Sequence, residues 1–156
     1  MIEIHVPGRR RLALAELVTD YNGTLAVDGI LRPGVPPLLR QLAGRLRLHV
    51  LTADTFGVAR EQLAGLPVAL TVLPPARQDQ AKRQYVESLG AAGVAAIGNG
   101  RNDALMLEAA GLGIAVVQEE GAALNALASA ELVCRSVEDA LGLLLNPQRL
   151  IATLRA

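Results

Sequence analysis

The 156-residue sequence has few aromatic residues, one cysteine and no net charge. Its only aromatic residues are Tyr21, Phe56 and Tyr85, too few for a surface on which nucleic-acid bases stack. Fifteen basic and fifteen acidic side chains cancel, so we expect no nucleic-acid partner and no anionic membrane surface as a partner. Cys134, as the single cysteine, excludes an internal disulfide and a multi-cysteine metal site.

Long apolar runs are also missing. No stretch approaches the roughly 18 consecutive apolar residues of a membrane span, and the first residues lack the apolar core of a signal peptide. With one cysteine, these features predict a cytoplasmic location. Apolar residues make up 51% of the chain, enough for one sizeable core, and no linker or repeat interrupts them. We therefore expect a single domain over residues 1–156.

Apolar, β-branched runs alternate with amphipathic segments along the chain. The N-terminal residues 1–14 predict a hairpin, residues 25–31 around Asp28-Gly29 predict a small hairpin flap, and residues 146–156 a last helix that Asn146 caps. Between them we expect strands over 17–19, 46–51, 68–73, 94–97, 114–117 and 132–134, and helices over 33–44, 55–65, 77–89, 104–110, 121–128 and 137–145. This alternation predicts an α/β fold, a three-layer sandwich around a mainly parallel sheet.

Polar residues follow three of these strands. Asp20, Thr52 and the loop 99–103 come directly after strand ends, and such ends share one edge of a parallel sheet, where ligands bind. Lys82, the only lysine among fifteen basic residues, lies early in a helix. Two plainer interpretations remain open: Asp20 followed by Asn-Gly is a turn, and Lys82 is a solvated side chain.

These residues resemble the motifs of a known superfamily. Asp20-Tyr21-Asn22-Gly23-Thr24, Thr52, Lys82 and Gly98-Asn99-Gly100-Arg101-Asn102-Asp103 are similar, in order, to the four motifs of the haloacid dehalogenase-like (HAD) phosphotransferases. The pattern looks closest to the phosphorylation domain of P-type ATPases, and to a soluble P-type ATPase-like group without a cap domain. The resemblance covers about residues 15–145 and implies a Rossmannoid fold, a phosphatase or ATPase-like hydrolase activity and a possible homo-oligomer. The connections 25–32 and 66–81 are too short for a cap domain.

The resemblance also implies roles for individual residues. Asp20 would be the nucleophile that forms an aspartyl-phosphate, on a small phosphorylated molecule or a phosphoprotein. Implied to hold the phosphoryl group are Tyr21, Gly23, Thr24, Thr52, Ala53 and Lys82. Implied to hold Mg²⁺ are Asp20, Asn22, Asn99 and Asp103, with Asp54 and Asn102 in support. For Asp54, a helix N-cap is an equally open interpretation.

Two positions depart from the superfamily pattern. Asn22 replaces the usual second Asp. An amide cannot exchange a proton, and general acid–base catalysis by such an Asp contributes a factor of about 10²–10⁴ in rate. We expect slow turnover of phosphate esters and better turnover of anhydrides or acyl phosphates. Asn99 replaces a metal-binding Asp, which predicts weaker Mg²⁺ binding. The alternative function is a catalytically weakened HAD domain that binds a phosphorylated ligand and regulates.

Two further residues have structural interpretations. His49 lies within an expected core strand and is predicted to be a hydrogen-bonded structural histidine. Cys134 is predicted to be a small buried apolar residue. The last helix is expected to pack on its own sheet, with a subunit contact as the alternative.

Overall fold

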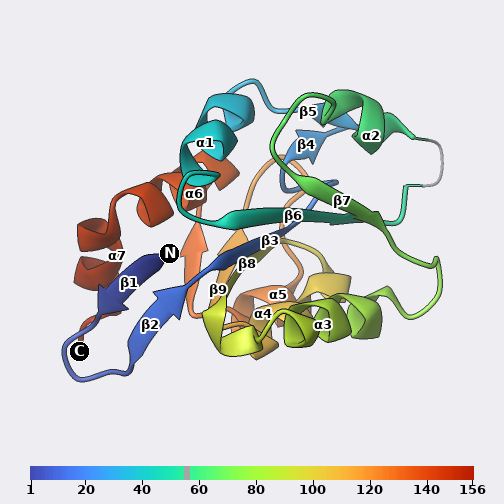
Figure 1. The fold of residues 1–156 in the computed structure, drawn as a ribbon. Coiled ribbons are helices and arrows are strands. Elements are labelled where there is room, and N and C mark those ends of the chain that lie inside the picture. Colours follow the sequence, from blue (N-terminus) through green and yellow to red (C-terminus); the bar gives the residue numbers. More distant parts are fainter. Residues whose placement is uncertain (55–56) are drawn as a thin grey trace.

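A computed structural model describes residues 1–54 and 57–156 of the chain. Six parallel strands form the central sheet in the order β10-β9-β8-β3-β6-β7 (Figure 1). Their bounds are β3 Glu16–Asp20, β6 Arg47–Thr52, β7 Ala69–Val72, β8 Val94–Gly98, β9 Leu112–Val116 and β10 Leu132–Cys134. The strand that carries Asp20 therefore lies inside the sheet, between β6 and β8.

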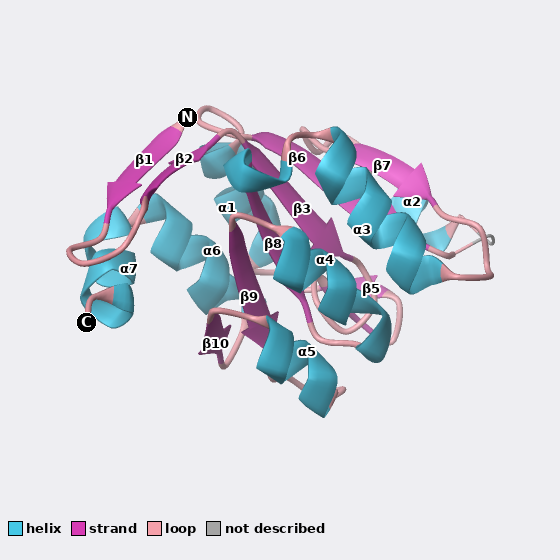
Figure 2. Cartoon of the chain, turned by 90° about the horizontal axis from the view of Figure 1, so that it is seen from below, coloured by secondary structure: helices cyan, strands magenta, loops and turns pink. Residues whose placement is uncertain are grey.

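Helices cover both faces of the sheet, as the alternating pattern predicts. α1, α6 and α7 lie on one side and α3, α4 and α5 on the other (Figures 1 and 2). The helices are α1 Val35–Leu42, α2 Val58–Gln62, α3 Gln78–Ser88, α4 Ala104–Ala109, α5 Leu124–Ser129, α6 Val137–Leu145 and α7 Pro147–Leu154, with 3₁₀ turns at Ala91–Gly93 and Arg101–Asp103. Within the described ranges, none of these helices has the length and apolarity to cross a bilayer. The expected three-layer α/β sandwich without a cap is confirmed.

Two antiparallel hairpins stand outside the main sheet. β1 (Ile2–His5) pairs with β2 (Arg11–Leu14), and β4 (Ala26–Val27) pairs with β5 (Ile30–Leu31). The turn of the second hairpin consists of Asp28 and Gly29, both with positive φ, which is the backbone of a tight hairpin turn. Both predicted hairpins are thus confirmed, and the second lies beside the end of β3.

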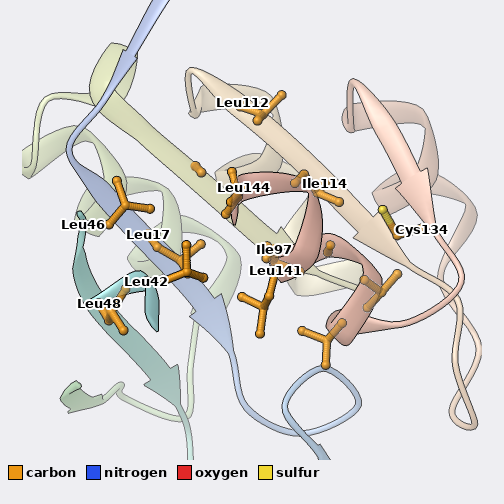
Figure 3. Close-up of a cluster of buried hydrophobic side chains, with 14 of the residues drawn as sticks. Leu17, Leu42, Leu46, Leu48, Ile97, Leu112, Ile114, Cys134, Leu141 and Leu144 are labelled. Atoms are coloured by element: carbon orange, nitrogen blue, oxygen red, sulfur yellow. The ribbon is translucent and has the colours of Figure 1, made fainter. Parts of the chain in front are cut away.

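Strand β3 is buried on both faces, which explains its unbroken apolar run. Leu17 points to the side of α1 and α6, where Figure 3 shows it with Leu42, Leu48, Ile97 and Leu141. Val18 points to the opposite core, which α3, α4 and α5 cover. The two packed faces hold the end of β3, and hence Asp20, in a fixed position.

Three local predictions need correction or comment. Helix α2 covers Val58–Gln62, and residues 55–56 of the predicted helix lie outside the described residues. The predicted helix over 121–128 begins only at Leu124, because Gly121 adopts φ +71° in a turn closed by its N–H on the Gln118 carbonyl. Asn146 makes no side-chain cap on α7, since its amide donates to the Gly142 carbonyl at the end of α6.

The structural predictions for single residues are confirmed. His49 contacts the Tyr85 hydroxyl at 2.9 Å through Nδ1 and the Glu16 carboxylate at 2.7 Å through Nε2. Cys134 is buried. The last helix, α7, buries Leu150 and Leu154, but it packs on α6 and on β1 of the N-terminal hairpin, so the expected packing on the main sheet needs correction.

Candidate active site

The carboxyl ends of the inner strands form one polar pocket. Asp20 ends β3, Thr52 ends β6 and Gly98 ends β8, immediately before Asn99. The pocket has a volume of about 230 Å³, and its lining includes Asp20, Asn22, Thr52, Ala53, Lys82, Asn99 and Asn102. The structure therefore brings together all four segments that the sequence singled out.

Lys82 is the electrostatic centre of the site. Its ammonium donates to Asp20 Oδ1 at 2.9 Å, to Asp103 Oδ1 at 2.8 Å and to Asn102 Oδ1 at 3.2 Å. The side chain is only 2% exposed. Burial by itself lowers the pKa of Lys82, but Asp20 and Asp103 raise it above its ordinary value, so the amine stays charged.

The Asp20 carboxyl is strongly perturbed. Burial, and next the negative charge of Asp103, raise its pKa to about 7, while Lys82 and a backbone N–H of Tyr21 act in the opposite direction. Two buried carboxylates share one ammonium here, so the site carries one net negative charge when both are ionised. A site with this imbalance has room for additional positive charge.

Asp103 is held by the loop on which it lies. Its Oδ2 accepts the backbone N–H groups of Asn99 at 3.0 Å and Gly100 at 2.8 Å, while Oδ1 accepts Lys82. A Cβ on Gly98 would lie 2.6 Å from Asp103 Cγ, so a glycine is required at that position. Both carboxylate oxygens are thus engaged, and Asp103 fixes the ammonium and the loop together.

Asn99 is packed against the turn after Asp20. Its Nδ2 donates to the Gly121 carbonyl at 3.0 Å, and its Oδ1 accepts the Thr24 hydroxyl at a long 3.4 Å. Gly23 adopts φ +77°, and a Cβ there would lie 2.6 Å from Asn99 Nδ2. Only a glycine permits this contact between the two motifs.

Two residues that the sequence placed in the site use their side chains elsewhere. The Tyr21 hydroxyl donates to the Gly29 carbonyl at 2.8 Å and ties the hairpin flap to β3, so only its backbone is near the pocket floor. Asp54 Oδ2 accepts the Ala59 N–H in the first turn of α2 at 2.9 Å. The Asp54 N–H donates to Thr52 Oγ1 at 3.0 Å, which orients that hydroxyl and leaves its proton available to donate.

Three residues of the site region were not found from the sequence. Gln78 and Glu120 line the pocket, and Gln118 Nε2 donates to the Gly23 and Thr24 carbonyls at 3.0 Å each. Gln78 lies four residues before Lys82, on the same face of α3, and Glu120 follows the end of β9. Helical spacing and the strand-end rule could have found both.

The donor set of the pocket is one of oxygen atoms. Asp20, Asn22 and Asn99 line the pocket, and their carboxylate and amide oxygens are hard ligands of the kind that Mg²⁺ prefers. Among residues 1–54 and 57–156, no group of three or more His, Cys, Asp or Glu side chains could hold a metal. A divalent ion therefore fits the chemistry of this pocket, but with fewer negative ligands than a carboxylate cage supplies.

Comparison with known proteins agrees with this geometry. Residues 84–144 match the family model described as haloacid dehalogenase-like hydrolase. A segment of 62 residues is 50% identical to an uncharacterized protein of Methanocaldococcus jannaschii. The matched segment makes up 40% of this chain and 67% of that protein. The chain belongs to the haloacid dehalogenase-like hydrolase superfamily.

Solved structures of HAD proteins share the whole architecture. A subfamily III A hydrolase from Legionella pneumophila superposes with a TM-score of 0.72 at 19% identity, over 89% of this chain and 86% of that one. The 3-deoxy-D-manno-octulosonate 8-phosphate phosphatase from Moraxella catarrhalis, in complex with magnesium, phosphate and 3-deoxy-D-manno-octulosonate, gives 0.71 at 17% identity over 91% and 94%.

The cobalt-bound deoxy-D-mannose-octulosonate 8-phosphate phosphatase from Haemophilus influenzae gives 0.72 at 17% identity over 87% and 90%. The first is described as a HAD superfamily hydrolase and the other two as phosphatases, and the likeness of all three supports the capless fold. They do not support the finer assignment to a P-type ATPase-like group.

Proposed function

We propose that this HAD protein is a Mg²⁺-dependent phosphohydrolase that works through an aspartyl-phosphate on Asp20. The contact that carries the proposal is the 2.9 Å hydrogen bond from the buried Lys82 ammonium to Asp20 Oδ1 at the carboxyl edge of the sheet. It combines a carboxylate nucleophile with a fixed positive charge for phosphoryl oxygens. A solvated lysine or a plain turn would need neither this burial nor this contact.

In the first step, the Asp20 carboxylate forms a bond to phosphorus while the bond from phosphorus to the leaving oxygen breaks. The leaving oxygen keeps the electron pair. Lys82 and the Thr52 hydroxyl offset the negative charge of the other phosphoryl oxygens. The Gly23 and Thr24 N–H groups, which the resemblance assigned to the phosphoryl group, already donate to the Ala26 and Tyr21 carbonyls. In the second step, water adds to phosphorus and loses a proton, and the bond to Asp20 breaks to release phosphate.

Asp20, the Asn99 amide oxygen and the Asn22 carbonyl would hold Mg²⁺, which when bound supplies positive charge beside the phosphoryl oxygens. Asp103 contributes indirectly and not as a ligand of the ion, because its oxygens already accept hydrogen bonds from Lys82 and from two backbone N–H groups. It keeps the ammonium in place and adds its charge to the attraction for the ion.

Asn22 determines which substrates react. It lines the pocket but cannot protonate a leaving oxygen, so poor leaving groups lose acid assistance of about 10²–10⁴. Acyl phosphates and phosphoanhydrides need no such proton and are the proposed substrate class. The two octulosonate phosphatases are named after 3-deoxy-D-manno-octulosonate 8-phosphate. This compound is a phosphate ester, and we expect this chain to turn it over slowly.

The neutral amides Asn22 and Asn99 also favour a second candidate function. A domain that binds a phosphorylated molecule or phosphoprotein without turnover would keep Thr52 and Lys82 for binding. It would have no need for a nucleophile, yet Asp20 is present and held in place. Turnover separates the two candidates.

The test is hydrolysis of acetyl phosphate and of p-nitrophenyl phosphate with and without Mg²⁺, by the wild type and by Asp20→Asn. We expect Mg²⁺-dependent release of phosphate from acetyl phosphate, slower release from the ester, and loss of both in Asp20→Asn. Tight binding of phosphate without any turnover would favour the regulatory function. Activity that survives Asp20→Asn would refute the proposal.

A further inference from the structure

A second, larger depression adjoins the active-site pocket. It is an open groove of about 520 Å³ over the start of α3 and the Arg101–Asp103 turn. The groove shares Gln78, Gly100 and Asn102 with the active-site pocket. A molecule with its phosphoryl group beside Asp20 therefore has the groove as its immediate neighbour.

The groove carries two arginines, Arg77 and Arg101, on exposed positions. Neither forms an ion pair with a carboxylate anywhere in the described parts of the chain, whereas Arg83, further along α3, pairs with Glu87 at 2.8 Å. The one acid in the lining is Asp79, whose Oδ1 accepts the N–H of Gln80. The net charge of the lining side chains is positive.

Arg77 occupies a backbone conformation that an arginine rarely adopts. Its φ of 56° and ψ of 43° are left-handed, at the residue before the first turn of α3. The same position before α2 has φ 83° and is occupied by Gly57. A non-glycine residue is strained in this conformation, because its Cβ crowds the following carbonyl oxygen. Strain of this kind is typical of functional positions, and here it presents a guanidinium at the groove.

A chain of hydrogen bonds links the groove wall to the catalytic ammonium. Gln78 Oε1 accepts Asn102 Nδ2 at 2.9 Å, and Asn102 Oδ1 accepts Lys82 Nζ at 3.2 Å. The two sides of the groove, α3 and the Arg101–Asp103 turn, are thereby held at a fixed spacing from the site of phosphoryl transfer. The groove is part of the same rigid arrangement as the pocket.

We propose that this groove is a subsite for a second anionic group of the substrate. The substrate class is a phosphorylated molecule that also carries a carboxylate or a second phosphate, since both fit the planar donor fork of arginine. This inference rests on the proposed function, because it places the reacting phosphoryl group beside Asp20. A neutral leaving group would leave Arg77 and Arg101 without a counter-charge.

The test measures binding with non-hydrolysable probes that differ only in the second group. Alkylphosphonates are compared with ω-carboxyalkylphosphonates and with α,ω-bisphosphonates of matched linker length, by titration calorimetry in Mg²⁺. The variants are Arg77→Gly, which keeps the backbone conformation accessible, Arg101→Ala and the double variant. Arg40→Ala is the matched control, because Arg40 is an exposed arginine on α1, on the opposite face of the sheet.

We expect the second anion to tighten binding to the wild type and to Arg40→Ala by about 10- to 100-fold, as charge-assisted hydrogen bonds at a partly exposed site do. The double variant should lose this advantage and still bind the simple phosphonates as the wild type does. The affinities of the ω-carboxyalkylphosphonates and of the α,ω-bisphosphonates, compared with each other, show which second anion the groove prefers.

Three results would overturn the subsite: equal affinity for mono- and dianionic probes, an advantage that survives in the double variant, or no binding of either probe to the wild type. If wild type shows the expected binding pattern but releases no phosphate from acetyl phosphate, the proposed turnover fails and the subsite stands.

Discussion

Replacement of Lys82 by methionine removes the one cation in the described part of the chain that contacts both buried carboxylates. Lys82 Nζ lies 2.9 Å from Asp20 Oδ1 and 2.8 Å from Asp103 Oδ1, and Asp103 is fully buried. Removal of one partner from a buried charge pair destabilises a protein by about 3–5 kcal/mol, because the other charge is left uncompensated. Since domains of this size have total stabilities of about 5–15 kcal/mol, Lys82→Met should be severely destabilised.

Urea unfolding followed by far-UV circular dichroism measures this loss, because the chain has no tryptophan for fluorescence. Arg83→Ala is the control on the same helix: its pair with Glu87 is half exposed, and we expect no measurable loss of stability. The double variant Lys82→Met/Asp103→Asn should recover about 1–2 kcal/mol, since the amide oxygen can still accept the N–H groups of Asn99 and Gly100.

Mg²⁺ should also stabilise Lys82→Met more than it stabilises the wild type, because the ion replaces part of the lost positive charge. A free energy of unfolding for Lys82→Met within about 1 kcal/mol of the wild type would refute the electrostatic account.

Three further predictions follow from single contacts. Asn22→Asp should raise hydrolysis of p-nitrophenyl phosphate by about 10²–10⁴ with little effect on acetyl phosphate, and equal changes for both would contradict the assigned role. Asn99→Asp should tighten Mg²⁺ binding in calorimetry, but cost about 1 kcal/mol of stability without the ion, because the Gly121 carbonyl loses its amide donor. Burial, and next the charge of Asp139, raise the pKa of the Cys134 thiol from 9.0 to about 11. The thiol should therefore react slowly with a disulfide reagent at neutral pH until urea unfolds the chain, and its contribution to stability should be full below pH 9 and fall as the pH rises to about 11.

Sequence reasoning succeeded where topology alone decides the outcome. Asp20, Thr52 and Asn99 follow parallel strands, and the strand order places all three ends at one edge whatever the side chains do. The position of Lys82 near that edge was predictable for a similar reason, since a helix after a strand begins there, but its burial was not. The predicted hairpins needed only local turn residues such as Asp28-Gly29.

The sequence did not predict the outcome where one side chain has two possible partners. Asn146 could cap α7 or bind the end of α6, and only the packed positions of the two helices select the Gly142 carbonyl. The metal-binding role expected for Asp103 stays a prediction, and the sequence pattern did not show that its Oδ2 accepts two backbone N–H groups. The left-handed backbone of Arg77 leaves no trace in the sequence, because nothing local favours it.

The central claim is that a phosphoryl group becomes bonded to the carboxylate of Asp20. The most direct measurement is to incubate the protein with acetyl phosphate and Mg²⁺, quench in acid, reduce with borohydride and sequence the peptides by mass spectrometry. An aspartyl-phosphate is reduced to homoserine, and we predict this conversion at position 20 in the wild type and in Asn22→Asp, but not without Mg²⁺. Phosphate release without any conversion at position 20, or conversion at another aspartate, would contradict the account.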